Sequence, residues 1–500
     1  MEILLAAPGK LSFFDFAKEF YNPKPLKRIL SLMRKSECKT IIIDDIEEND
    51  KDQTDFEEHK DIPGYNLVTR VKKRLLFFEK EFLTPEEICE ECNFLGYANI
   101  YIDSFEDGSI KSYIDEALIH NSKLYLGKSY LCCNTNKIIR IANYDFNING
   151  SYFVQQQGKI NCCSHANIRM VGNTFRACDA QDYHHSFINK TLCIDVAKIA
   201  ADGLNSNQIR EIFEQRGLKC FTYAFNFPDS KNDEDYITSQ YNFQQMAYYA
   251  IESGFPVLII FKTGERAHVI CAFGHTFNEN SWLPEAEQQY FKLNGDIQYL
   301  CSTLWVDDFI IHDDNYGPYY CLPASFLADK ETLLIAITNL KTDMFGHHAE
   351  FYAIKFLYSY LITSLINKKL IGSTKWNDVF FDHFMRKNLI LRTLYVKKDE
   401  YLKQLRAFPF LQRENFSYIN NLPSEFWLTE ISVPELFNIN KKKIAEVIIN
   451  PKLNYPNCIK AINLPSIFIL NENDDMMLQI IPKTSESPLN LLKLATTAPV

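Results

Sequence analysis

Two adjacent cysteines, Cys162 and Cys163, open a stretch with helical spacing of apolar residues and are the side chains best suited to covalent chemistry. A thiol attacks as a thiolate, and a helix N-terminus together with a nearby imidazolium stabilises that form. The run "CSHANIRMVGNTF" predicts a helix that begins at Cys163 and turns its apolar residues toward a core, namely Ala166, Ile168, Met170 and Val171. Cys163 would then lie at the positive end of the helix dipole.

The other groups that thiol chemistry requires lie on both sides of Cys163 in the sequence. His268 opens the apolar stretch "HVICAF" and can act as the base, while the strand-like run "FIIHDD" ends in two carboxylates that can hold the imidazole in one tautomer. Asp313 is the first choice for this role and Asp314 the alternative. The oxyanion donors would be the backbone N–H of Cys163 and the side-chain amide of Gln157. Two glutamines that precede Gln157 are equally available.

The run Gln-Gly-x-x-x-x-Cys, from Gln157 to Cys163, resembles the oxyanion-glutamine and nucleophile arrangement of papain-like cysteine peptidases. The stretch "CSHANIRM" is similar to the Cys-Gly-Pro-Ala-Ala-Leu-Ala-Met helix start of the bacteriocin-leader-processing (double-glycine) peptidases, a branch of that superfamily. The resemblance covers about residues 150–325 and selects Cys163, with Cys162 as the alternative nucleophile. It departs from the family at Ser164, where papain-like enzymes have tryptophan, and in a longer stretch between the histidine and the aspartate.

The resemblance implies an α+β fold in which the helix that carries Cys163 packs on a twisted antiparallel sheet bearing His268 and Asp313. It also implies a Cys-His-Asp triad that hydrolyses a peptide or isopeptide bond of a protein or peptide substrate through a thioester acyl-enzyme. An acyl or aminoacyl transferase on the same fold is one alternative. A catalytically inactive papain-like binding or scaffold protein is the other.

Two further sets of residues have some character of a metal site. Cys89 and Cys92 have the spacing of half a zinc site, but closure needs two more ligands, and adjacent strand cysteines such as Cys132 and Cys133 point to opposite faces. The sequence "TPEEICEEC" is better explained as the start of a helix capped by Thr84. The second set lies in and near a polar loop and consists of Cys162, His165, His184 and His185. We expect neither a metal nor a cofactor.

The length of 500 residues exceeds what one hydrophobic core normally organises, so several domains are expected. We expect an N-terminal mixed α/β region over 1–149, a papain-like domain over 150–338 and a C-terminal domain of mixed helices and strands over 339–500. The acidic tract over 44–61 has few apolar residues to bury and repels itself, which favours a mobile loop.

Composition and charge narrow the classes of function and location. The net charge of −10 argues against a general nucleic-acid binder, because phosphate neutralisation needs clustered Lys and Arg. The N-terminus has no basic leader, and the most apolar later stretch, over 351–366, contains Lys355 and is too short to span a membrane. The 14 cysteines are then expected to be reduced thiols in a cytoplasmic protein. The oligomeric state stays open.

Overall fold

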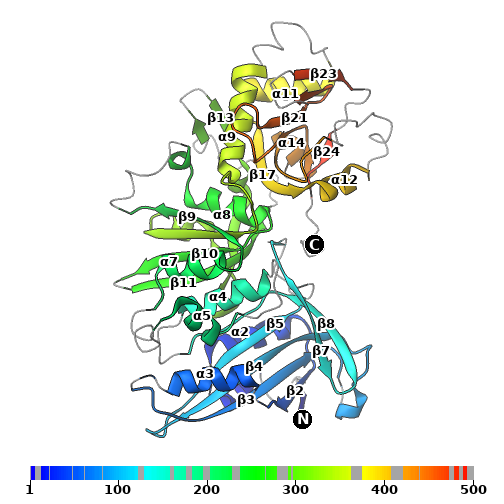
Figure 1. The fold of residues 1–500 in the computed structure, drawn as a ribbon. Helices are drawn as coiled ribbons and strands as arrows, with labels where there is room; N and C mark the ends of the chain where they lie inside the picture. Colours follow the sequence, from blue (N-terminus) through cyan, green and yellow to red (C-terminus); the bar gives the residue numbers. More distant parts are fainter. Residues whose placement is uncertain are drawn as a thin grey trace.

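The computed structural model has a mixed α+β architecture with several antiparallel sheets, arranged as three units along the long axis of the molecule (Figure 1). The structure describes residues 2–5, 13–21, 23–47, 49–60, 62, 64–81, 83–121, 129–157, 163–175, 183–194, 203–227, 237–264, 266–278, 291–293, 297–361, 374–406, 421–437, 440–471, 478–483 and 488–492. No helix in these ranges is both long enough and apolar enough to cross a membrane.

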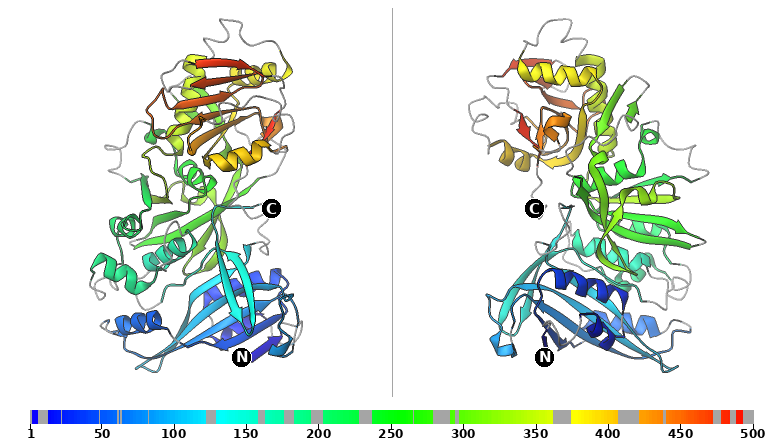
Figure 2. Two further views of the ribbon diagram at one scale, coloured as in Figure 1. Left: turned by 45° about the vertical axis from the view of Figure 1, so that its right-hand side comes forward. Right: turned by 180° about the vertical axis from the view of Figure 1, so that it is seen from behind.

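The N-terminal unit is built on a five-stranded antiparallel sheet in sequence order. Its strands are β1 (Glu2–Leu5), β2 (Thr40–Asp45), β3 (Leu67–Phe78), β4 (Phe94–Phe105) and β5 (Ile110–Ile119). Helix α2 (Lys24–Lys35) buries one apolar face, including Leu26, Ile29 and Leu30, and contacts both β5 and the central unit. A hairpin of β7 (Thr135–Ile141) and β8 (Tyr144–Gly150) leads toward the central unit (Figures 1 and 2).

The acidic tract does not form the expected loop. It contains the end of β2 and helix α3 (Asp50–Lys60), so that expectation is wrong. The physical reason is that its carboxylates have partners: Asp52 is buried, accepts a hydrogen bond from Lys72 Nζ at 2.8 Å and another from the hydroxyl of Tyr101, and exchanges capping hydrogen bonds with Asn49. These contacts pair the Asp52 carboxylate with a cation and cap the start of α3, which favours a helix over a loop.

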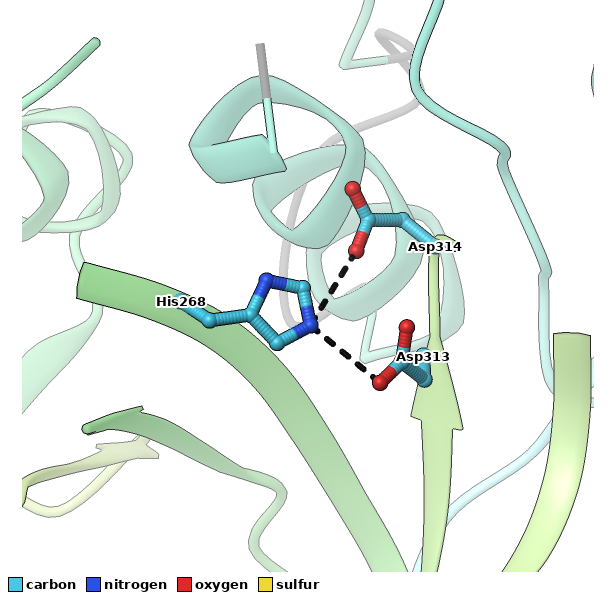
Figure 3. A group of neighbouring side chains, drawn as sticks. All are labelled: His268, Asp313 and Asp314. Atoms are coloured by element: carbon cyan, nitrogen blue, oxygen red, sulfur yellow. Dashed lines mark hydrogen bonds and ion pairs between the residues drawn. The ribbon is translucent and has the colours of Figure 1, made fainter. Parts of the chain in front are cut away.

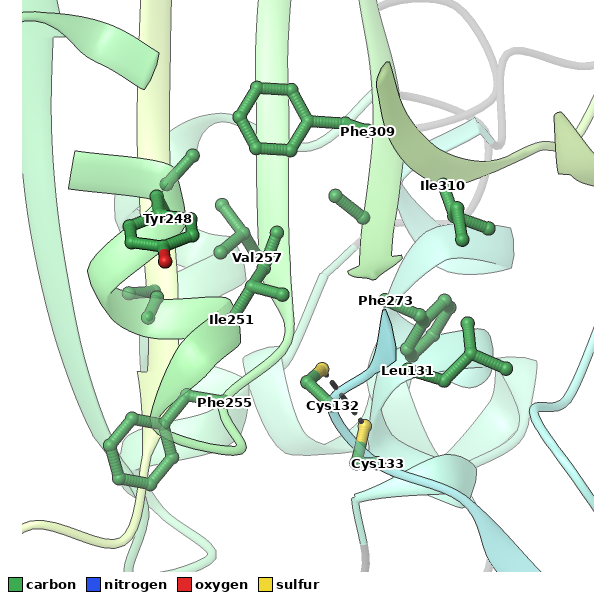
Figure 4. Packing of buried hydrophobic residues seen from close by; sticks show 14 of the residues in the cluster. Leu131, Cys132, Cys133, Tyr248, Ile251, Phe255, Val257, Phe273, Phe309 and Ile310 are labelled. Atoms are coloured by element: carbon green, nitrogen blue, oxygen red, sulfur yellow. Dashed lines mark hydrogen bonds between the residues drawn. The ribbon is translucent and has the colours of Figure 1, made fainter. Parts of the chain in front are cut away.

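The central unit is a seven-stranded antiparallel sheet in the order β15-β14-β11-β10-β16-β9, with β6 paired to β11. Its strands are β6 (Ser129–Leu131), β9 (Lys219–Phe225), β10 (Val257–Thr263), β11 (Arg266–Phe277), β14 (Val306–Asp313), β15 (Gly317–Pro323) and β16 (Thr332–Thr338). Helices α4 (Cys163–Thr174), α5 (His185–Leu192), α7 (Ser206–Glu214) and α8 (Phe243–Glu252) accompany it. Tyr248 and Ile251 of α8 pack beside Val257, Phe273 and Phe309 of the sheet (Figure 4).

The C-terminal unit contains an eight-stranded sheet in the order β12-β13-β17-β18-β20-β21-β22-β23. Its strands are β12 (Phe291–Leu293), β13 (Ile297–Cys301), β17 (Ile390–Lys397), β18 (Glu425–Ser432), β20 (Ala445–Ile449), β21 (Ile459–Asn463), β22 (Ile467–Asn471) and β23 (Leu478–Pro482). Strands β12 and β13 come from the stretch between His268 and Asp313, and β13 pairs in parallel with β17. The stretch is long because it leaves the central sheet and joins its neighbour.

Buried charges connect the central and C-terminal units. Arg392 on β17 donates to Glu252 on α8 at 2.7 Å and to Glu430 on β18, also at 2.7 Å. His275 on β11 contacts the same Glu252 carboxylate at 2.6 Å. Because removing one partner would leave an unpaired buried charge, this network favours one fixed arrangement of the two units.

Candidate active site

Helix α4 begins at Cys163, as the sequence predicts, and presents this half-buried thiol at its N-terminus. The side-chain amide of Asn167 donates to the carbonyl oxygens of Cys163 and Val269, at 2.9 Å in both cases. Val269 directly follows His268 on β11. One fully buried side chain therefore fastens the start of α4 to the start of the strand that carries the imidazole.

Strand pairing brings His268 next to both candidate carboxylates. Strands β11 and β14 are antiparallel and Cys271 pairs with His312, so the first residues of β11 lie beside the end of β14. His268 Nε2 lies 3.2 Å from Asp313 Oδ2 and 3.8 Å from Asp314 Oδ1 (Figure 3). Asp313 Oδ1 also accepts a hydrogen bond at 2.9 Å from the backbone N–H two residues later, which fixes its carboxylate in a turn.

The protonation of His268 is set by this surrounding charge. Burial lowers its pKa, but hydrogen bonds with the side chains of Asp313 and Cys163 and the charges of Asp314 and Asp313 raise the pKa to about 10. The imidazole is then protonated at neutral pH. The Cys163 side chain thus contributes to the raised pKa of the imidazole, in keeping with the Asn167 hydrogen bonds that join the start of α4 to β11.

Asp314 differs from its neighbour in its surroundings. It is fully buried, and burial raises its pKa to about 7, opposed by the charge of His268 and supported by that of Asp313. Asp313 is thus the nearer and hydrogen-bonded partner of the imidazole, and Asp314 is a second carboxyl that exchanges a proton near neutral pH.

The side chain of Gln157 is hydrogen-bonded to the N-terminal unit. Its amide nitrogen donates at 2.8 Å to Asp103 on β4, which also accepts two hydrogen bonds from Arg70. One of the two amide hydrogens is therefore engaged, and the role of Gln157 as an oxyanion donor stays a prediction. The two preceding glutamines have other partners, the backbone N–H of Ile114 and the side chain of Asn315. Cys162, the alternative nucleophile, lies outside the described residues.

In the part of the chain that the structure describes, one group of side chains lies close enough together to bind a metal ion. One nitrogen or oxygen atom from each of His268, Asp313 and Asp314 lies within 4.8 Å of the others, close enough to share an ion. An imidazole and two carboxylates suit a first-row divalent ion. Of the other proposed ligands, His165 contacts Asn189 Oδ1 at 2.9 Å with its pKa lowered by burial to about 4, and His184 caps α5.

Two positioning residues on α4 were missed from the sequence. Asn167 interrupts the apolar face one helical turn after Cys163, which is the signal that could have found it. Arg169 pairs with Asp115 on β5 at 2.8 Å, and Asp115 also pairs with Lys72 at 3.1 Å. Burial raises the pKa of Asp115, but the charges of Arg169 and Lys72 outweigh it and hold the pKa at about 2. The N-terminal sheet thus clamps the helix that bears the thiol.

Searches against protein-family models, curated proteins and solved structures found no match to this chain.

Proposed function

We propose that the protein is a cysteine-nucleophile hydrolase of the papain-like type, with Cys163 as nucleophile, His268 as base and acid, and Asp313 as orienting carboxylate. The observation that carries the proposal is the contact of His268 Nε2 with Asp313 Oδ2 at 3.2 Å, on a strand that Asn167 ties to Cys163 at the N-terminus of α4. A helix packed beside an antiparallel sheet, with nucleophile, base and carboxylate in that chain order, supports the papain-like assignment.

In the proposed mechanism, each of these groups acts in a defined step of the reaction. Nε2 of His268 faces the carboxylates (Figure 3). In the proposed mechanism, Nδ1 is therefore the ring nitrogen that exchanges a proton with the Cys163 thiol. The thiolate attacks the acyl carbon, the imidazolium protonates the departing amine, and a thioester remains. The imidazole then takes a proton from water, which attacks the thioester and releases the acid. The N–H of Cys163, and Gln157 through its second amide hydrogen, would stabilise the oxyanion; one such donor contributes about 10²–10³ in rate.

The test is site-resolved alkylation of Cys163 by iodoacetamide across pH, measured by mass spectrometry in the full chain. An ordinary thiol with a pKa of ~8.5 is about 0.3 % ionised at pH 6. We expect Cys163 to label about tenfold or more faster at pH 6 than the exposed Cys193, and His268→Ala to abolish this advantage. Labelling only after unfolding, or an unchanged rate in the His268→Ala variant, would make Cys163 structural and the protein a binding module.

Turnover separates hydrolysis from acyl transfer. Fluorogenic peptide and isopeptide substrates should be cleaved by the wild type and not by Cys163→Ser. Both reactions pass through the same thioester, so an added primary amine such as glycine ethyl ester distinguishes them. A hydrolase should still release the free acid, whereas a transferase should release the amide of the added amine.

The cluster of His268, Asp313 and Asp314 supports one second candidate, a divalent-metal site. Equilibrium dialysis with Zn²⁺ or Mn²⁺ tests it. Binding that survives Cys163→Ser and is lost in Asp314→Asn would favour the metal site over the thiol mechanism.

A further inference from the structure

Cys89 and Cys92 form a second thiol site, in the N-terminal unit. The backbone N–H of Cys92 donates to the carbonyl of Cys89 at 3.0 Å, so the four residues form a turn after the 3₁₀ segment η1 (Pro85–Glu87). A turn of this kind keeps its end Cα atoms within about 7 Å, near the 4.4–6.8 Å span of a disulfide. The two Sγ atoms are already 3.5 Å apart. Bond formation at ~2.05 Å needs only a small rotation of the side chains.

The two thiols have unequal surroundings. Cys89 is half-buried and reachable by solvent, whereas Cys92 is 2 % exposed and packs in the apolar cluster behind the sheet. Lys80 Nζ lies 3.8 Å from the Cys89 sulfur. The hydrogen bond from Cys92 lowers the pKa of Cys89, and Lys80 lowers it further, while burial raises the pKa of Cys92. An accessible thiol with a lowered pKa beside a buried thiol is an arrangement that favours disulfide exchange.

The fold does not add the further ligands that a zinc site at Cys89 and Cys92 needs. Among the residues that the structure describes, no third His, Cys, Asp or Glu joins the two sulfurs in a group of possible ligands. Cys132 and Cys133 form a second pair of neighbouring thiols, with their sulfurs 3.7 Å apart. The expectation that these two side chains point to opposite faces of a strand is wrong, because β6 ends at Leu131. That pair is buried in the central core and closed to solvent (Figure 4).

We propose that Cys89 and Cys92 are a redox-active dithiol that reduces an external disulfide, independently of Cys163. The Cys89 thiolate attacks one sulfur of the substrate disulfide, and the bonding electron pair leaves with the other sulfur as a thiolate. Cys92 then releases its proton and attacks the Cys89 sulfur, which expels the second thiolate. The substrate gains two electrons, the protein pair loses two, and the internal disulfide stores the oxidised state.

The charge around the pair selects the substrate class. Residues 79–91 carry six glutamates and a single lysine, Lys80, and those that flank the cysteines are exposed. Such a field repels anionic disulfides and attracts cationic ones, with effects on encounter rates of about tenfold or more at low salt. The substrates are therefore neutral or cationic disulfides.

The experiment treats the reduced full chain at low ionic strength with three disulfides: cystamine (cationic), bis(2-hydroxyethyl) disulfide (neutral) and oxidised glutathione (anionic). Mass spectrometry after alkylation of the remaining thiols locates each disulfide. We expect an internal Cys89–Cys92 bond, formed about tenfold faster with cystamine than with oxidised glutathione, and a difference that shrinks in 1 M salt. The variant Cys92→Ser should instead trap a mixed disulfide on Cys89.

Three controls make the outcome decisive. Lys80→Gln should slow the reaction with the neutral disulfide, and Cys163→Ala should not change it, so this proposal and the hydrolase proposal fail separately. The buried pair Cys132 and Cys133 should stay reduced. The proposal is overturned if Cys89 in Cys92→Ser reacts no faster with the neutral disulfide than the exposed Cys193 does, or if no internal bond forms in the wild type.

Discussion

Replacement of Asp313 by Asn tests which carboxylate controls His268. The imidazole contacts Asp313 at 3.2 Å with a hydrogen bond and Asp314 at 3.8 Å, and its pKa is raised to about 10. An opposite charge within this distance shifts a pKa by ~1–3 units, so Asp313→Asn should lower the His268 pKa by about 2 units, to about 8. That change equals about 2.7 kcal/mol, or about a hundredfold less imidazolium relative to imidazole.

The sharpest difference falls near pH 9. There, a pKa of 10 leaves about 90 % of the imidazole protonated, and a pKa of 8 leaves about 10 %. The assay is the titration of the His268 Cε1 resonance in histidine-labelled protein, assigned by its loss in His268→Gln. Asp314→Asn should shift the midpoint by only about 1 unit, because Asp314 is farther from the imidazole, at 3.8 Å, whereas the hydrogen bond of the imidazole is with Asp313.

Two results would contradict this reasoning. A midpoint within about 0.3 units of the wild type in Asp313→Asn would show that the carboxylate does not pair with the imidazole. A larger shift in Asp314→Asn than in Asp313→Asn would make Asp314 the orienting residue. The urea midpoint of each variant, measured at pH 6, controls for a change in fold.

Three further predictions follow from buried contacts. Asn167→Leu removes both hydrogen bonds that join α4 to β11, so the urea midpoint should fall by the equivalent of about 1–3 kcal/mol and the rapid alkylation of Cys163 at pH 6 should be lost; unchanged labelling would exclude a positioning role. Arg169→Met breaks a buried ion pair and should cost about 3 kcal/mol at pH 7. The pKa of Asp115 is about 2 in the folded state against 3.8 in the unfolded state. Its pairing therefore stabilises the protein above about pH 4, and this stabilisation is lost as the pH falls toward 2. Between pH 2 and 6, the urea midpoint should depend less steeply on pH in Arg169→Met than in the wild type. Glu350, in the helix Gly346–Phe356, is fully buried and accepts hydrogen bonds from the hydroxyls of Tyr249 and Tyr299. Burial raises its pKa from 4.5 to about 7, so wild-type stability should decrease by about 3 kcal/mol as the pH rises from 4.5 through 7. Glu350→Gln should remove that decrease, measured as urea midpoints at pH 5 and 8.

Local patterns determined the start of α4 and the identity of two candidate groups. The apolar spacing after Cys163 predicts a helix from that residue, because helix geometry repeats over a few residues, and the structure confirms it. Strand patterns likewise placed His268 at the start of β11 and Asp313 at the end of β14. These features depend on near neighbours in the chain, which a single sequence contains.

Tertiary structure decided everything that depends on distant partners. Part of the acidic tract forms α3, in which Asp52 accepts hydrogen bonds from Lys72 and Tyr101, and no local pattern specifies those contacts. The same holds for the side chain of Gln157, which turns to Asp103, a residue of the N-terminal sheet. The pairing of β13 with β17 also lay beyond sequence patterns, since strand pairing is a choice among many possible neighbours. The sequence therefore specifies which groups are able to react, and the packing of the three units determines which of them meet.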